Sequence, residues 1–191
     1  MNKNKKQMKM KTIGIFVGSL RKASYTKSIA RYIVGQSSDA FCYKIIDIGE
    51  LPLYNQDFDD IGPAPDSYGR FRKSVDGLDG VLFITPEYNR SVPAVLKNAL
   101  DVGSRPYGHN VWSGKPGAII SASPGNIGAF GANHHLRQSL VFLNVLTLQQ
   151  PEAYLAHIAN SVGEDGEIHD PKLEEYLGNF LISFKEWVDK F

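Results

Sequence analysis

Five short apolar runs alternate with five segments of helical periodicity, and this alternation constrains the fold more than any other feature of the chain. The apolar runs cover residues 12–17, 43–48, 80–84, 117–122 and 145–148, and the helical patterns cover residues 25–36, 66–78, 92–102, 129–142 and 171–191. Strands that alternate with helices along a chain usually pair in parallel, because each helix carries the chain back across the sheet. The sequence therefore predicts a single α/β domain over residues 12–191, with a five-stranded parallel sheet covered on both faces.

Charge is distributed unevenly along the chain. The 191 residues carry a formal net charge of +1, but residues 1–11 contain five lysines and no acid. The rest of the chain has 16 basic and 20 acidic residues, a net charge of −4, which argues against a nucleic-acid surface. We expect residues 1–11 to form a disordered basic tail.

Composition also bears on the compartment and on metals. No run approaches the roughly 18 apolar residues of a membrane span, and the single Cys42 cannot form a disulfide within the chain. These features predict a cytoplasmic protein with no membrane partner. The five histidines show neither a His-Glu-x-x-His motif nor pairing with cysteine, so we expect no metal site.

A hydroxyl-rich stretch, Gly18-Ser19-Leu20-Arg21-Lys22-Ala23-Ser24-Tyr25-Thr26, joins the first predicted strand to the first predicted helix. The start of a helix offers unpaired backbone N–H groups and the positive end of the helix dipole, which together favour an anion. The chain lacks the Gly-rich motifs that bind a γ-phosphate or a pyrophosphate, so this loop suits a terminal monophosphate. An ordinary serine N-cap beside a solvated arginine is the alternative interpretation.

Two further motifs follow the third and fourth predicted strands. Pro86-Glu87-Tyr88-Asn89 comes after residues 80–84, and Ser121-Ala122-Ser123-Pro124-Gly125 opens a glycine-rich loop after residues 117–122. Loops that follow the strands of a parallel sheet emerge at the same edge, so the three motifs are expected to face one crevice. They predict a shared ligand site.

The motifs together resemble the NAD(P)H-dependent FMN reductases, a family that includes bacterial quinone, chromate and azo-dye reductases. Further carriers of the resemblance are Ser91-Val92-Pro93, Lys97-Asn98-Ala99-Leu100-Asp101 and His135-Leu136-Arg137-Gln138. It implies a flavodoxin-like three-layer sandwich with strand order 2-1-3-4-5, an FMN cofactor, NADH or NADPH as co-substrate, and a homodimer or homotetramer. The family usually has asparagine where this chain has Thr26, which bears on cofactor affinity. The implied cofactor-binding residues are Ser19, Leu20, Arg21, Ser24, Tyr25, Thr26, Pro86, Glu87, Tyr88, Asn89, Ser123 and Gly125.

We therefore expect hydride transfer from NAD(P)H through the flavin to small-molecule acceptors such as quinones, azo compounds, metal oxyanions or free flavin, with ping-pong kinetics and no catalytic side chain. An electron carrier or FMN sensor without turnover is the alternative. A serine hydrolase with Ser123 as nucleophile, and His157 or His169 with Asp165 or Asp170, is a weaker rival. Pro124 lacks the N–H that such an enzyme uses in its oxyanion hole.

Overall fold

The computed structural model describes residues 10–191 and contains one parallel sheet with strand order β2-β1-β3-β4-β5, as predicted. Strands β1 and β3 lie side by side, with Ile13 opposite Gly80 and Val17 opposite Ile84. The strands are β1 (Lys11–Val17), β2 (Phe41–Ile45), β3 (Gly80–Thr85), β4 (Pro116–Ala122), β5 (Leu146–Thr147) and β6 (Ala153–Leu155).

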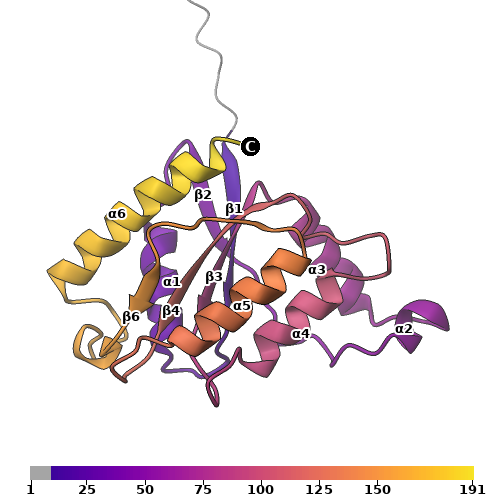
Figure 1. Ribbon diagram of the computed structural model, residues 1–191, viewed down its shortest axis with the longest axis horizontal. Helices are drawn as coiled ribbons and strands as arrows, with labels where there is room; N and C mark the ends of the chain where they lie inside the picture. The colour runs from indigo at the N-terminus through magenta and orange to yellow at the C-terminus, as the bar shows by residue number, and fades with distance from the viewer. Residues whose placement is uncertain (1–9) are drawn as a thin grey trace, which may run out of the picture.

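Helices cover both faces of the sheet (Figure 1). Helices α1 (Tyr25–Gly35) and α6 (Pro171–Val188) pack on one face, and α3 (Asp66–Asp76), α4 (Ala94–Gly103) and α5 (Phe130–Phe142) pack on the other. A four-residue helix, α2 (Asp57–Asp60), lies in the long connection after β2, and a short 3-10 helix, η1 (Ile158–Asn160), follows β6. The result is the expected flavodoxin-like three-layer sandwich, and its carboxyl edge lies at the bottom of Figure 1.

The outer position beside β4 is filled by two short strands instead of one. Strand β5 pairs with Pro116 and Gly117, and β6, which was not expected, pairs in parallel with the other end of β4 from Ile120 to Ala122. The chain between them contains Pro151, which has no N–H to donate to a strand ladder. Of the predicted strand 145–148 only Leu146 and Thr147 form β5, and within residues 10–191 the sheet has six strands instead of five.

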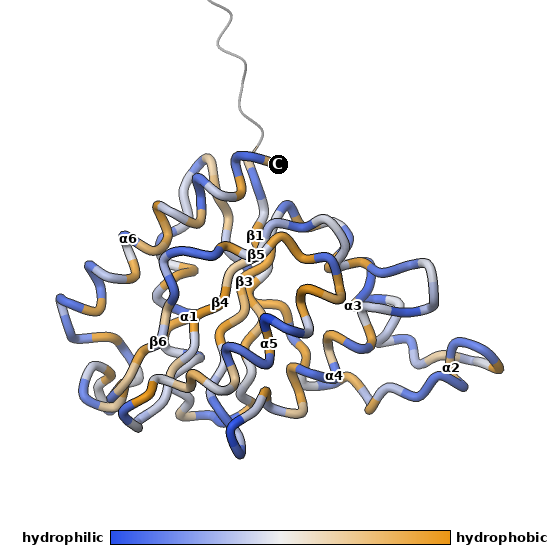
Figure 2. Tube along the Cα trace, in the orientation of Figure 1, coloured by the Kyte–Doolittle hydropathy of each residue, from blue (hydrophilic) through white to orange (hydrophobic). Residues whose placement is uncertain are grey.

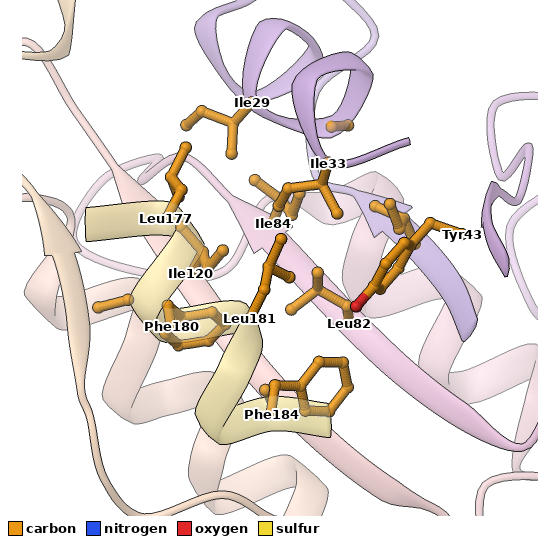
Figure 3. Close-up of a cluster of buried hydrophobic side chains, with 14 of the residues drawn as sticks. Ile29, Ile33, Tyr43, Leu82, Ile84, Ile120, Leu177, Phe180, Leu181 and Phe184 are labelled. Atoms are coloured by element: carbon orange, nitrogen blue, oxygen red, sulfur yellow. The ribbon is translucent and has the colours of Figure 1, made fainter. Parts of the chain in front are cut away.

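Apolar side chains fill the two spaces between the sheet and its helices, and the inner strands are the most hydrophobic part of the trace (Figure 2). On the first face, four side chains of α6 point toward Leu82, Ile84 and Ile120 of the sheet (Figure 3). These α6 side chains are Leu177, Phe180, Leu181 and Phe184. Six apolar residues of α6, from Leu173 to Val188, are buried.

Element boundaries differ from the sequence predictions by a few residues. Strand β2 begins at Phe41 and ends at Ile45, two to three residues earlier than expected. Helix α4 begins at Ala94, two residues later than the predicted start at residue 92, and Pro93 is its N-cap residue. Strand β1 already includes Lys11, while residues 1–9 of the predicted tail lie outside the described residues. Across residues 10–191, we find no helix with the length and apolar character needed to cross a bilayer.

Candidate functional site

The first loop, between β1 and α1, places polar donors around the open end of a helix. Ser24 is the N-cap residue of α1, and its hydroxyl lies 2.9 Å from that of Thr26. Ser19, Ser24 and Thr26 are buried, whereas Arg21 is exposed beside them. The backbone N–H groups of Tyr25 and Thr26 donate to no acceptor within residues 10–191.

The donors of this loop fit a phosphate monoester. The first turn of α1 contains no acidic residue, so nothing in that turn compensates the positive end of its dipole. Hydroxyls, free N–H groups and a guanidinium are all able to donate to phosphate oxygens. The Thr26 hydroxyl, which is buried beside that of Ser24, is one of these donors.

The second loop follows β3 and lies directly against the first. Gly18 sits so close to it that an added Cβ would lie 3.0 Å from Thr85 Oγ1 and 3.1 Å from the Pro86 ring. Tyr88 and Ser91 exchange backbone hydrogen bonds of 3.0 and 2.9 Å across a two-residue turn. Asn89 and Arg90 in this turn have φ angles of 50° and 64°, the geometry of a type I′ turn.

The Glu87 carboxylate ties the second loop to α5. Its Oε2 accepts a hydrogen bond of 3.0 Å from the Ala132 N–H, and its Oε1 accepts one of 3.2 Å from Arg90. Tyr88, by contrast, has a side chain that is half exposed.

The third loop, between β4 and α5, is held against β6. The Ser123 N–H donates to the Leu155 carbonyl at 3.0 Å, and the Ser123 hydroxyl donates to the Gly125 carbonyl at 3.3 Å. Gly128 has a φ of +56° and packs so tightly that an added Cβ would lie 2.6 Å from the Tyr154 carbonyl carbon. A side chain at this position would force β6 away from the loop.

A buried polar network supports the third loop from below. The Ser121 hydroxyl donates to the Gly128 carbonyl at 2.8 Å and accepts from the Asn133 amide at 3.2 Å. Arg137 in turn donates to Asn133 at 3.1 Å and to the Leu148 carbonyl at 3.1 Å. Arg137, one of the carriers of the family resemblance, thus has a supporting role in the structure. The network links β4, α5 and the segment that leads to β6.

Residues of all three loops line one cavity at the carboxyl edge of the sheet. It brings together nine of the twelve predicted residues, with Ala122 and Pro124 as additional members. The nine are Ser19, Arg21, Ser24, Tyr25, Thr26, Pro86, Glu87, Tyr88 and Ser123. The three motifs are thus neighbours in space, and their binding of FMN stays a prediction.

Three predicted residues lie at the margin of this cavity instead of on its wall. Leu20 is 55% exposed and packs beside Gly49, and Asn89 lies in the type I′ turn. The Gly125 carbonyl accepts from Ser123 and from the His157 N–H at 3.3 Å. A larger cavity on the outer side of the first loop shares Arg21, Ser24 and Tyr25 and is bounded by residues 159–167. Sequence reasoning missed it, because its far wall comes from the connection after β6.

The structure does not assemble the serine hydrolase constellation. His169 Nε2 lies 2.9 Å from the Asp165 carboxylate, while Asp170 accepts from the Ser161 hydroxyl at 2.7 Å and caps α6. The Ser161 hydroxyl lowers the pKa of Asp170, and the Glu167 N–H together with His169 lowers that of Asp165. Within the described chain, no histidine is hydrogen-bonded to Ser123, and no group of His, Cys, Asp and Glu residues could hold a metal ion.

Comparison with known proteins places this site in a family. Residues 10–160 match the family model described as NADPH-dependent FMN reductase. A quinone reductase of Pseudomonas putida is 50% identical over 177 residues, which cover 93% of this chain and 94% of that protein. A 2-hydroxy-1,4-benzoquinone reductase of a Burkholderia species is 42% identical over 176 residues, which cover 92% and 95%.

A solved structure agrees with the sequence matches. It is a flavoenzyme NAD(P)H:(acceptor) oxidoreductase from Paracoccus denitrificans, 39% identical, with a TM-score of 0.87 over 95% of this chain and 98% of that one. The chain therefore belongs to the NADPH-dependent FMN reductase family and is an oxidoreductase with FMN as its cofactor and NAD(P)H as its co-substrate.

Proposed function

We propose that this protein is a quinone reductase that holds FMN across the three loops and transfers electrons from NAD(P)H to a quinone. The observation that carries the proposal is the open N-terminus of α1, whose donors line the same cavity as residues of the second and third loops. Two of its relatives are named as quinone reductases, one of them for a hydroxylated benzoquinone.

Each loop has its own part in this assignment. Ser19, Arg21, Ser24 and Thr26, with the free N–H groups of α1, hold the phosphate. Residues 86–89 and Ser123 line the rest of the cofactor, and Leu20, Tyr25 and Gly125 complete its surroundings. When bound, FMN supplies a two-electron carrier, so no side chain is required to take the hydride.

The same site suits two substrates in turn. Because the three loops form one cavity, we propose that NAD(P)H and the acceptor use it alternately, which gives ping-pong kinetics. A site shared in this way also accommodates azo compounds, metal oxyanions or free flavin as acceptors.

The test is reduction of the bound flavin by NAD(P)H in the absence of oxygen, followed by steady-state kinetics with NAD(P)H and a quinone. We expect NAD(P)H to bleach the flavin of the purified protein before any acceptor is added, and a soluble quinone to restore the colour. Double-reciprocal plots at several quinone concentrations should be parallel. Intersecting lines would contradict the shared site, and failure of NADH and NADPH to bleach bound FMN would favour an electron carrier or sensor.

We also infer a homodimer or homotetramer that works in the cytoplasm. Val141 and Phe142, near the end of α5, are 75% and 85% exposed, and Phe142 lines a groove between α4 and α5. Exposed apolar residues of this size suit a subunit contact. Light scattering of the purified protein tests the assembly, and a monomer at micromolar concentration would contradict it. Cell fractionation tests the compartment.

A further inference from the structure

The start of α5 has no capping side chain of its own. Its N-cap residue is Ala129, whose backbone is left-handed at φ 61° and ψ 38°, and the first turn of α5 contains no acidic residue. The first N–H groups of a helix have no partner within the helix and need an acceptor from elsewhere.

Glu87 supplies that acceptor from a distant part of the sequence. Its Oε2 accepts from the Ala132 N–H at 3.0 Å, across a separation of 45 residues. The Glu87 side chain is only 11% exposed, whereas that of its second partner, Arg90, is 74% exposed. The bond to α5 is therefore the sheltered one, and the bond to Arg90 lies at the surface.

Glu87 also belongs to the loop that lines the candidate cofactor cavity. Its contact with α5 connects this second loop to the helix that follows the third loop. The polar network of Ser121 and Asn133 holds the third loop to α5 and β4, so the second loop is fixed to an already supported unit.

We propose that Glu87 is a positioning residue that fixes the second loop for FMN by capping α5, and that it is not an acid–base group in the reaction. Both of its carboxylate oxygens already accept hydrogen bonds from the protein. A group that exchanges a proton with substrate needs an oxygen that can reach it. This proposal rests on the assignment of FMN to this cavity.

A set of three substitutions separates the position of the acceptor from its charge. Glu87→Gln keeps an oxygen at the same reach without the charge, Glu87→Asp keeps the charge but shortens the side chain, and Glu87→Ala removes both. Arg90→Ala is the matched control, because it removes only the exposed partner of Glu87. FMN affinity of each apo-protein is measured by flavin fluorescence quenching, well below its melting temperature.

We expect Glu87→Asp and Glu87→Ala to weaken FMN binding by about tenfold, within the range of one ordinary hydrogen bond. Glu87→Gln and Arg90→Ala should stay within about threefold of the wild type, because an uncharged acceptor still caps the helix. Flavin reduction by NAD(P)H in Glu87→Gln should have the same pH dependence as in the wild type. If Glu87→Ala does not fold, the Gln and Asp variants still make the comparison.

Two results would overturn the proposal. Wild-type affinity in Glu87→Asp would show that the reach of the side chain does not matter. A loss or shift of the pH dependence in Glu87→Gln with FMN still bound would assign Glu87 a proton-transfer role. Failure of the wild type to bind FMN would instead contradict the proposed function, so the two failures are distinguishable.

Discussion

Helices α1 and α5 each follow a strand of the sheet through a loop, yet their N-termini have different surroundings. The start of α1 is capped by its own Ser24, and the N–H groups of Tyr25 and Thr26 have no acceptor among residues 10–191. The start of α5 receives the carboxylate of Glu87 from a neighbouring loop. Neither helix has an acidic residue in its first turn, so the difference comes from tertiary structure.

This difference indicates which helix end is available for a ligand. An anion is attracted to any helix N-terminus, but a carboxylate that already sits there repels a second anion. At α5 the protein supplies its own anion, whereas α1 keeps its donors for one from outside. The comparison therefore supports our proposal that the FMN phosphate binds at α1.

The largest effect on FMN affinity is expected from placing a carboxylate at the start of α1, as Glu87 does at the start of α5. Ser24→Asp supplies an equally good N-cap, so the apo-protein should be as stable as the wild type or slightly more stable. The new carboxylate would repel the phosphate by about 4 kcal/mol at close range, and FMN affinity should fall by more than about 100-fold. Isothermal titration gives the affinity and thermal unfolding of the apo-protein gives the stability.

Ser24→Asn is the matched control for this experiment, because asparagine is also a good N-cap but is neutral. It should lose far less affinity than Ser24→Asp. Equal losses in the two variants would mean that the phosphate does not lie at α1.

A smaller effect is expected from removing the exposed cation beside this helix end. Arg21→Ala should weaken FMN binding by about 10- to 150-fold, because one charge-assisted hydrogen bond is worth about 1.5–3 kcal/mol. Lys22→Ala removes the adjacent positive charge, which does not line the candidate cavity, and should have little effect. Similar losses in both variants would indicate that only the overall charge of the loop matters.

The smallest effect on FMN affinity is expected at α6, whose N-cap residue, Asp170, is itself an acid. Asp170→Ala should leave FMN affinity unchanged and lower the melting temperature, because Asp170 caps α6 and accepts from Ser161. The pKa of Asp170 is lowered in the folded state, so its charge stabilises the protein above its unfolded pKa of about 4. That contribution is lost as the pH falls through the lowered folded value.

Thermal unfolding of the wild type and of Asp170→Ala, at pH values above and below about 4, measures this contribution of Asp170 to stability. The difference in melting temperature should be largest above about pH 4 and shrink below it. A constant difference at every pH would show that the charge of Asp170 does not contribute.

The sequence predicted the features that depend on local pattern and on parallel topology. The alternation of apolar runs and helices predicts that residues after β1, β3 and β4 share one edge, and the motifs there line one cavity. Ser24 was identifiable as a helix cap because it directly precedes the periodic segment.

Contacts between distant segments could not be read in the same way. The bond between Glu87 and Ala132 joins residues with no sequence pattern that relates them. Strand β6 has only three residues and pairs with the part of β4 that lies beyond its pairing with β5. The network of Ser121, Asn133 and Arg137 likewise depends on packing of α5 against β4.

The central claim is that the open N-terminus of α1 binds the phosphate of FMN. The most direct measurement is isothermal titration of one apo-protein preparation with FMN and with riboflavin, which differ only in that phosphate. We predict that FMN binds at least about 100-fold more tightly, because two or more charge-assisted hydrogen bonds depend on the phosphate. Affinities for the two flavins within about threefold of each other would contradict the claim, since about 0.7 kcal/mol is less than one such bond contributes.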